Sequence, residues 1–189
     1  MKETEGRKRV IIENVNPEID CGNFPVRRVT GEKVQVSADI FADGHNEIKT
    51  VLLQRKKGKH TWEEIPMTFI SNDHWEAEFK VNETGWYEYT LQGWVDHFAS
   101  WQKSIKAKYE ANQDVSVELQ IGRLMMEKAR KLAIPTHKIK LDQWIAFIND
   151  VKNNPAAAVA LVLSDEVSEV MYRCTDRKDA ATYEKTLLV

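Results

Sequence analysis

The sequence predicts an α+β protein, in which an immunoglobulin-like β-sandwich of about seven antiparallel strands carries a bundle of three to four helices inserted before its last strand. Three observations lead to this prediction. Hydrophobic residues alternate with a period of two through roughly the first 110 residues, as in half-buried strands. The period then changes to 3.6, as in amphipathic helices. Finally, the chain returns to an apolar, strand-like run at Leu187-Leu188-Val189.

The β part reads as short alternating segments separated by turn residues. Val34, Val36, Ala38 and Ile40 alternate with polar residues, so one face of this strand should be buried. A charged turn over 55–59 predicts a hairpin between the runs 48–54 and 62–67. The runs 75–81 and 86–91 flank a second turn, and we expect these two strands to pair directly. Lys103, Lys106 and Lys108 are expected on the solvent face of a later strand.

The helical part is expected after Asn112. One helix is predicted to end at Pro135, a second to run over 141–152, and a third to open at Asn154-Pro155, where an N-cap residue precedes proline. A fourth is expected over 167–173. The predicted buried face of the first helix contains Val117, Ile121, Leu124, Met125, Lys128 and Leu132; that of the second contains Leu141, Trp144, Ile145, Ile148 and Val151.

These patterns predict three parts along the chain. Residues 1–112 form the sandwich, residues 113–182 form the helical insert, and residues 183–189 return to the sandwich as a strand. Because the last residues are apolar and stop within a strand-like run, the sequence reads as cut from something longer. The helices are then an insertion into the β-domain and not a domain that follows it.

Composition narrows the classes of partner. The chain has 189 residues, with 27 Lys and Arg against 29 Asp and Glu, so its formal net charge is −2. A balance of this kind gives no reason to expect nucleic acid or anionic membranes as partners. No apolar run approaches the length of a membrane span, and the charged N-terminus lacks the apolar stretch of a signal peptide. We therefore expect a cytoplasmic protein.

The sequence contains no constellation typical of an enzyme. There is no phosphate-binding loop, dinucleotide fingerprint, zinc-protease motif or nucleophile elbow. The five histidines are scattered over different segments, and the two cysteines have no metal-ligand spacing. Glu63 and Glu64 are adjacent in a strand and point to opposite faces, so they cannot act as an acid–base pair. We expect no catalytic residues, no metal and no cofactor in this chain.

Aromatic residues suggest the one candidate site. Five of the six tryptophans precede residue 102, and sugar rings stack on exposed tryptophan, so a carbohydrate-binding module is one interpretation. The alternative is that these rings fill the core or pack against another domain. The densest segment runs from Trp94 to Trp101. The candidate interface or sugar-contact residues are Trp94, Asp96, Phe98 and Trp101, together with Trp144 on the second predicted helix.

Several separated motifs, in order, resemble one enzyme family. They are the runs 10–20 (VIIENVNPEID), 24–28 (FPVRR), 38–45 (ADIFADGH), 94–101 (WVDHFASW) and 113–115 (QDV). Together they are similar to the opening of α-1,4-glucan:maltose-1-phosphate maltosyltransferases, which extend α-glucans from maltose 1-phosphate. The resemblance covers nearly the whole chain, although between residues 120 and 182 it is one of layout.

The resemblance implies a role without chemistry of its own. Full-length members resemble α-amylases, of the glycoside hydrolase 13 superfamily, with a catalytic (β/α)8 barrel after this region and an aspartate nucleophile and a glutamate acid/base. No segment of this chain matches those barrel motifs. The resemblance therefore implies a non-catalytic N-terminal β-sandwich with a helical insert. Its expected partners are the protein's own barrel, a second copy in a homodimer, and an α-glucan or maltooligosaccharide.

Overall fold

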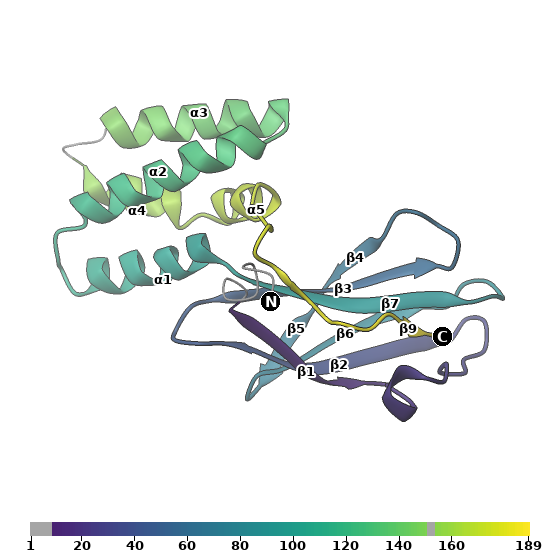
Figure 1. Cartoon of the computed structure of the whole chain (residues 1–189). Helices are drawn as coiled ribbons and strands as arrows, with labels where there is room; N and C mark the ends of the chain where they lie inside the picture. Colours follow the sequence, from purple (N-terminus) through teal and green to yellow (C-terminus); the bar gives the residue numbers. More distant parts are fainter. Residues whose placement is uncertain (1–8, 151–153) are drawn as a thin grey trace, which may run out of the picture. The chain divides into compact units, whose positions relative to one another are not determined.

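The computed structural model describes residues 9–150 and 154–189, and it divides the chain into two compact units (Figure 1). The first unit is the chain up to Val95 together with Lys178–Val189, and the second is Asp96–Arg177. Within the described residues the first unit holds nine strands in two antiparallel sheets, and the second holds five α-helices. The predicted α+β class is confirmed.

The first sheet has the strand order β1–β2–β6–β5. In β2, Val34, Val36, Ala38 and Ile40 are fully buried, which confirms the predicted alternation of its two faces. Across the sheet Val34 lies opposite Phe79 of β6. The strands are β1 (Val10–Asn16), β2 (Lys33–Ala42), β5 (Thr68–Ser71) and β6 (His74–Lys80).

The second sheet has the order β4–β3–β7–β8, and β9 also pairs with β7. The predicted hairpin around the charged turn is confirmed, because β3 pairs with β4. After five helices the chain adds two short segments to β7, so strands far apart in sequence are neighbours here. The strands are β3 (Ile48–Lys56), β4 (Glu63–Pro66), β7 (Tyr87–Val95), β8 (Ala181–Thr182) and β9 (Leu187–Leu188).

The expected direct pairing of the strands on either side of residues 82–85 is wrong. β6 pairs with β2 and β5, whereas β7 pairs with β3 and lies in the other sheet. In the turn at residues 82–85 the chain passes from the first sheet to the second. The turn is held by the hydroxyl of Tyr87, which accepts a hydrogen bond from the backbone N–H of Glu83 at 3.2 Å. A two-residue hairpin turn and a crossing turn use the same polar residues, so sequence alone did not separate them.

One buried cluster takes side chains from both sheets. Its largest fully buried members include Ile40 of the first sheet and Leu52, Tyr89 and Leu91 of the second. The last residues of the chain also belong to it, since Leu187 and Val189 are 3% and 8% exposed. Tyr89 donates a hydrogen bond from its hydroxyl to the carbonyl of Pro17, so its buried polar atom has a partner.

The second unit begins with a helix where a strand was expected. Phe98, Trp101 and Ile105 are buried at a helical spacing in α1, and Lys103 and Lys106 are exposed on the same helix, not on a strand. The prediction failed because the three lysines are spaced by three and then two residues, over a stretch too short to separate the helical period from the strand period. The helices are α1 (His97–Glu110), α2 (Ser116–Leu132), α3 (Pro135–Asp150), α4 (Pro155–Val162) and α5 (Asp165–Arg173).

One helix boundary differs from the expected one, and another is as expected. Pro135 opens α3 instead of merely ending α2, a position that suits its missing N–H. The expected cap at Asn154 is confirmed, because its side chain accepts a hydrogen bond from the backbone N–H of Ala157. In α3 the predicted positions Leu141, Trp144 and Ile148 are buried. Val151, the last residue of that predicted face, lies outside the described residues.

Candidate functional site

The five residues that the sequence singled out are all buried. Trp94 lies near the end of β7, Asp96 precedes α1, Phe98 and Trp101 belong to α1, and Trp144 belongs to α3. Their exposed fractions run from 3% to 8%. Side chains buried to this degree do not offer a ring face to a sugar. A role for them at an interface or in glucan binding stays a prediction.

Asp96 has a local structural role at the start of α1. Its carboxylate accepts a hydrogen bond from the backbone N–H of Ala99 at 2.9 Å, and its carbonyl accepts bonds from the backbone and side chain of Ser100. This is the geometry of an N-cap, which satisfies donors that the first helical turn leaves without intrahelical partners. The neighbouring residue His97 is the first residue of the helix. Asp96 and His97 are therefore the N-cap and the first residue of α1.

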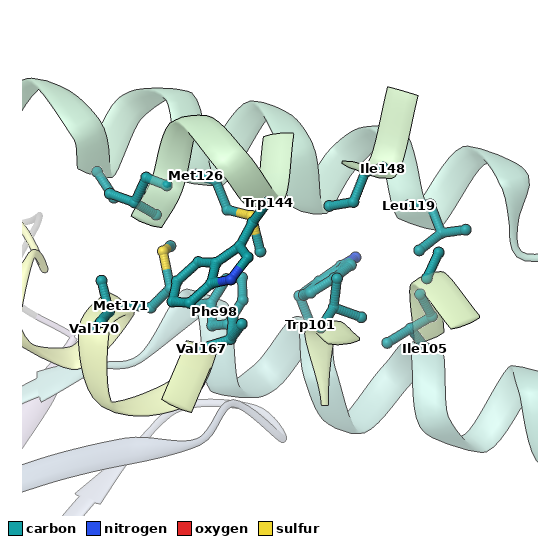
Figure 2. Close-up of a cluster of buried hydrophobic side chains, with 14 of the residues drawn as sticks. Phe98, Trp101, Ile105, Leu119, Met126, Trp144, Ile148, Val167, Val170 and Met171 are labelled. Atoms are coloured by element: carbon teal, nitrogen blue, oxygen red, sulfur yellow. The ribbon is translucent and has the colours of Figure 1, made fainter. Parts of the chain in front are cut away.

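Phe98, Trp101 and Trp144 form part of the core of the helical unit. Figure 2 shows them within one cluster of buried side chains, which also includes aliphatic residues and Met126 and Met171 from the other helices. The rings of Phe98 and Trp101 have centroids 5.1 Å apart, and the indole N–H of Trp101 donates to the carbonyl of Glu118 at 3.0 Å. The aromatic density that the sequence shows is thus the packing of this core.

An apolar surface on α2 was missed because the helix has two apolar faces. The residues of α2 that the structure buries are Leu119, Gly122, Met126 and Ala129, which recur at helical spacing. The predicted buried face is instead turned outward. Four of its apolar side chains, here called the α2 stripe, are exposed by 67%, 43%, 48% and 58%: Val117, Ile121, Leu124 and Leu132. Of the predicted buried face only Met125 packs against the core, where it is partly buried, and the prediction is wrong for its other residues.

The stripe and the buried face lie on opposite sides of α2. At 100° per residue, positions 117, 121, 124, 128 and 132 fall within one narrow sector, and positions 119, 122, 126 and 129 fall in the sector opposite. Lys128 is the polar member of the stripe. Both faces obey the same period, so periodicity could not choose between them. The buried face differs from the stripe in its small residues, Gly122 and Ala129, which allow another helix to approach closely.

A polar pocket of about 400 Å³ lies in the β unit, where the end of β3 and the start of β4 meet the turn between β6 and β7. Its lining is mainly polar. The cationic members are Arg55, Lys56, Lys59 and Lys80, and the acidic members are Glu63 and Glu83. Amide and hydroxyl groups come from Gln54, Thr61 and Asn82, and the aromatic members are Trp62 and Tyr87.

Several of the pocket's charges are neutralised inside the protein. The guanidinium of Arg55 lies 4.1 Å from the centre of the Trp62 ring and forms an ion pair with Glu88 at 2.6 Å. Lys56 donates to Glu83, and this bond lowers the pKa of the Glu83 carboxyl and raises that of the Lys56 ammonium. The charge of Lys59 also lowers the Glu83 pKa. The amide of Gln54 donates to Glu63.

Neither metal chemistry nor a membrane span is indicated in the described part of the chain. Among residues 9–150 and 154–189, no group of three or more His, Cys, Asp or Glu side chains is arranged to hold a metal ion. Over the same residues, every helix is too short or too polar to cross a bilayer. His74 does contact two carboxylates, Asp39 at 3.0 Å and Glu76 at 3.4 Å, and the hydrogen bond that the Asp39 carboxylate accepts from the imidazole raises the imidazole pKa.

Known proteins of one family match this chain over almost its whole length. Residues 8–189 match the family model described as α-1,4-glucan:maltose-1-phosphate maltosyltransferase, domain N/S. Enzymes of that name from Chlorobaculum tepidum and Myxococcus xanthus are 42% and 37% identical to it, and the one from Methylacidiphilum infernorum is 34% identical. In each case the match covers 98% of this chain.

The chain spans only a quarter to a third of those relatives. It covers 27% of the Chlorobaculum and Methylacidiphilum proteins and 29% of the Myxococcus protein. The similarity therefore concerns one region of a longer enzyme. With a family model that matches both the β unit and the helical unit, and with relatives that agree over the same residues, the chain belongs to the α-1,4-glucan:maltose-1-phosphate maltosyltransferase family, as its domain N/S.

Proposed function

We propose that this chain is a non-catalytic N-terminal module of a maltosyltransferase that elongates α-1,4-glucans from maltose 1-phosphate. In this proposal it forms a homodimer contact and packs against the catalytic barrel of its own protein. The observation that carries the proposal is the α2 stripe, an apolar surface on a helix that already buries its other face. Exposed apolar side chains that line up on one helix are typical of protein–protein interfaces.

The stripe is suited to a second copy of the same chain. Val117, Ile121, Leu124 and Leu132 extend along most of α2, and Lys128 is the one charge among them. A helix with this pattern can pack against its own copy across a twofold axis, because each stripe then covers the other. Polar and charged residues flank it, including Gln120 and Lys131. The stripe thus resembles an interface centre with a polar rim.

We also propose that the β unit is an immunoglobulin-like sandwich with the helical unit as its insert. The order β1–β2–β6–β5 corresponds to A–B–E–D of that fold, and β4–β3–β7–β8 corresponds to C′–C–F–G. Tyr87 supports the assignment, since a tyrosine at the start of strand F whose hydroxyl bonds to the preceding corner is typical of the fold. The helices then lie between strands F and G.

The competing interpretation, an α-glucan-binding module, has less support. It was based on five tryptophans, of which Trp94 and Trp101 are buried, Trp62 and Trp75 are partly buried, and Trp86 is 52% exposed. A glucan site of the usual kind needs exposed rings that lie side by side. We therefore place the docking role first.

Sedimentation of the 189-residue chain tests the dimer. We expect a concentration-dependent dimer whose Kd rises at least about tenfold on Leu124→Glu, because a charge then has to be buried at the interface centre. The matched control is Ala107→Glu, which places the same charge at an exposed position on α1. A chain that stays monomeric at high concentration, or a Leu124→Glu dimer as stable as the control, would contradict the role of the stripe.

A further inference from the structure

The polar pocket of the β unit has two cationic groups available to a ligand. Arg55 and Lys56 are occupied by Glu88 and Glu83. Within residues 9–150 and 154–189, the ammonium groups of Lys59 and Lys80 form no ion pair with a carboxylate. Lysine ammonium groups that converge on one pocket favour a compact anion such as a phosphate, with which each can make a charge-assisted hydrogen bond.

The rest of the lining suits a hydroxyl-rich molecule. Gln54, a residue that is 9% exposed, lines the pocket, and Asn82 and Thr61 add further donors and acceptors. The Trp62 ring is held in place by the Arg55 guanidinium on one of its faces, and a fixed indole is a common partner of sugar rings. The volume of about 400 Å³ lies in the range of small-molecule sites.

We propose that this pocket binds a small phosphorylated sugar, with the phosphate held by Lys59 and Lys80 and the sugar hydroxyls by Gln54 and Asn82 beside Trp62. The choice of a sugar phosphate over other anions rests on the proposed function, because the relatives are named for maltose 1-phosphate. The pocket belongs to the β unit, whereas the α2 stripe belongs to the helical unit.

Isothermal titration of the 189-residue chain with maltose 1-phosphate tests this site at low salt, where charge pairing is least screened. We expect saturable binding that weakens at least about tenfold on Lys59→Gln and on Lys80→Gln. Lys57→Gln is the matched control, because Lys57 is an exposed neighbour in the same loop and does not line the pocket. It should bind as the parent chain does.

A second pair of variants tests the ring. Trp62→Ala should weaken binding about tenfold, and Trp62→Phe should restore part of it, since phenylalanine keeps a ring at that position. Trp86→Ala serves as control, because Trp86 is 52% exposed at the same end of the unit and is not part of the lining. Circular dichroism of each variant shows whether the β unit is still folded.

Competing ligands supply the outcomes that would overturn the proposal. If inorganic phosphate binds as tightly as maltose 1-phosphate, the sugar does not contribute to recognition. If maltose binds as tightly, the phosphate does not contribute. Tighter binding of ATP would make the pocket a nucleotide site. Saturation with none of these probes would leave no ligand site. None of these results bears on the dimer, which sedimentation of the α2 variants measures separately.

Discussion

Gly122 is the residue on which the packing of α1 against α2 most depends. A Cβ at this position would lie 2.3 Å from two ring atoms of Trp101, Cζ2 and Cη2, which are themselves buried. Trp101 is fixed by its bond to the carbonyl of Glu118 and by the Phe98 ring, so it has little room to move. The glycine is therefore needed for close approach and not for backbone freedom.

Gly122→Ala should accordingly destabilise the helical unit. At an exposed helical site the same change stabilises by about 1 kcal/mol, but here we expect a loss of about 1–3 kcal/mol from overpacking. Urea unfolding followed by far-ultraviolet circular dichroism measures it. Adding Trp101→Phe to Gly122→Ala should recover part of the loss, because the smaller ring leaves space for the methyl group. A gain in stability from Gly122→Ala alone would refute this account of the contact.

At the scale of elements, the short strand β9 shows how register divides one apolar run between core and surface. Leu187 is 3% exposed and belongs to the core between the sheets, whereas its neighbour Leu188 is only partly buried. The alternation follows from the pairing of Leu187 with Tyr89 and of Leu188 with Glu88. Leu187 also lies close to Gly22, where a Cβ would come within 2.9 Å of its Cδ2.

Two alanine substitutions test this register. Leu187→Ala should lower the free energy of unfolding by about 2–5 kcal/mol, as expected for removal of a packed leucine. Leu188→Ala is the matched control in the same strand and should cost clearly less, because more of its side chain is already in water. Denaturation monitored by tryptophan fluorescence compares the two. Equal losses would mean that the strand does not hold this register.

At the scale of the whole molecule, the β unit is closed by contacts between its first and last segments. The carboxylate of Glu18 accepts hydrogen bonds from the Tyr183 hydroxyl and from the Lys185 ammonium, the latter at 2.6 Å. The bond from Lys185 and the bond from Tyr183 lower the pKa of Glu18, and Glu18 raises the pKa of Lys185. These contacts join residues more than 160 positions apart in the sequence.

The lowered pKa of Glu18 makes the free energy of unfolding depend on pH. Because the pKa of Glu18 lies below its ordinary value of 4.5 in the folded protein, its contribution is present above that pH and is lost as the pH falls through the lowered pKa. At pH 7, Glu18→Gln should lower Tm by up to about 3 °C, a modest effect because the pair is partly exposed. The difference from the parent chain should shrink toward pH 3.

Thermal unfolding over the range from about pH 7 to pH 3 checks this prediction, with Glu13→Gln as the control. Glu13 is an exposed residue of β1, close in sequence to Glu18, and its substitution should leave the pH profile unchanged. A Glu18→Gln difference that stays constant across the range would mean that the carboxylate's charge does not contribute to the closure.

Local patterns in the sequence predict the class and order of most elements, with α1 as the exception. The alternation in β2, the hairpin of β3 and β4, the cap at Asn154 and the buried face of α3 follow from local patterns, because neighbours in sequence fix them. The motifs at the start of the chain and around Trp94 also identified the family that the comparisons then matched. The local periodicity and the order of the motifs can both be recognised without knowledge of the tertiary structure.

Which of two equivalent apolar surfaces is buried depends on contacts with residues distant in the sequence. Both faces of α2 have the period of 3.6, and the core lies on the one that holds Gly122, because that face alone admits the Trp101 ring. The sheet to which β7 belongs, and the burial of Trp101 and Trp144, depend likewise on partners distant in sequence. Periodicity states that a face is apolar, but the partner that covers it comes from elsewhere in the chain.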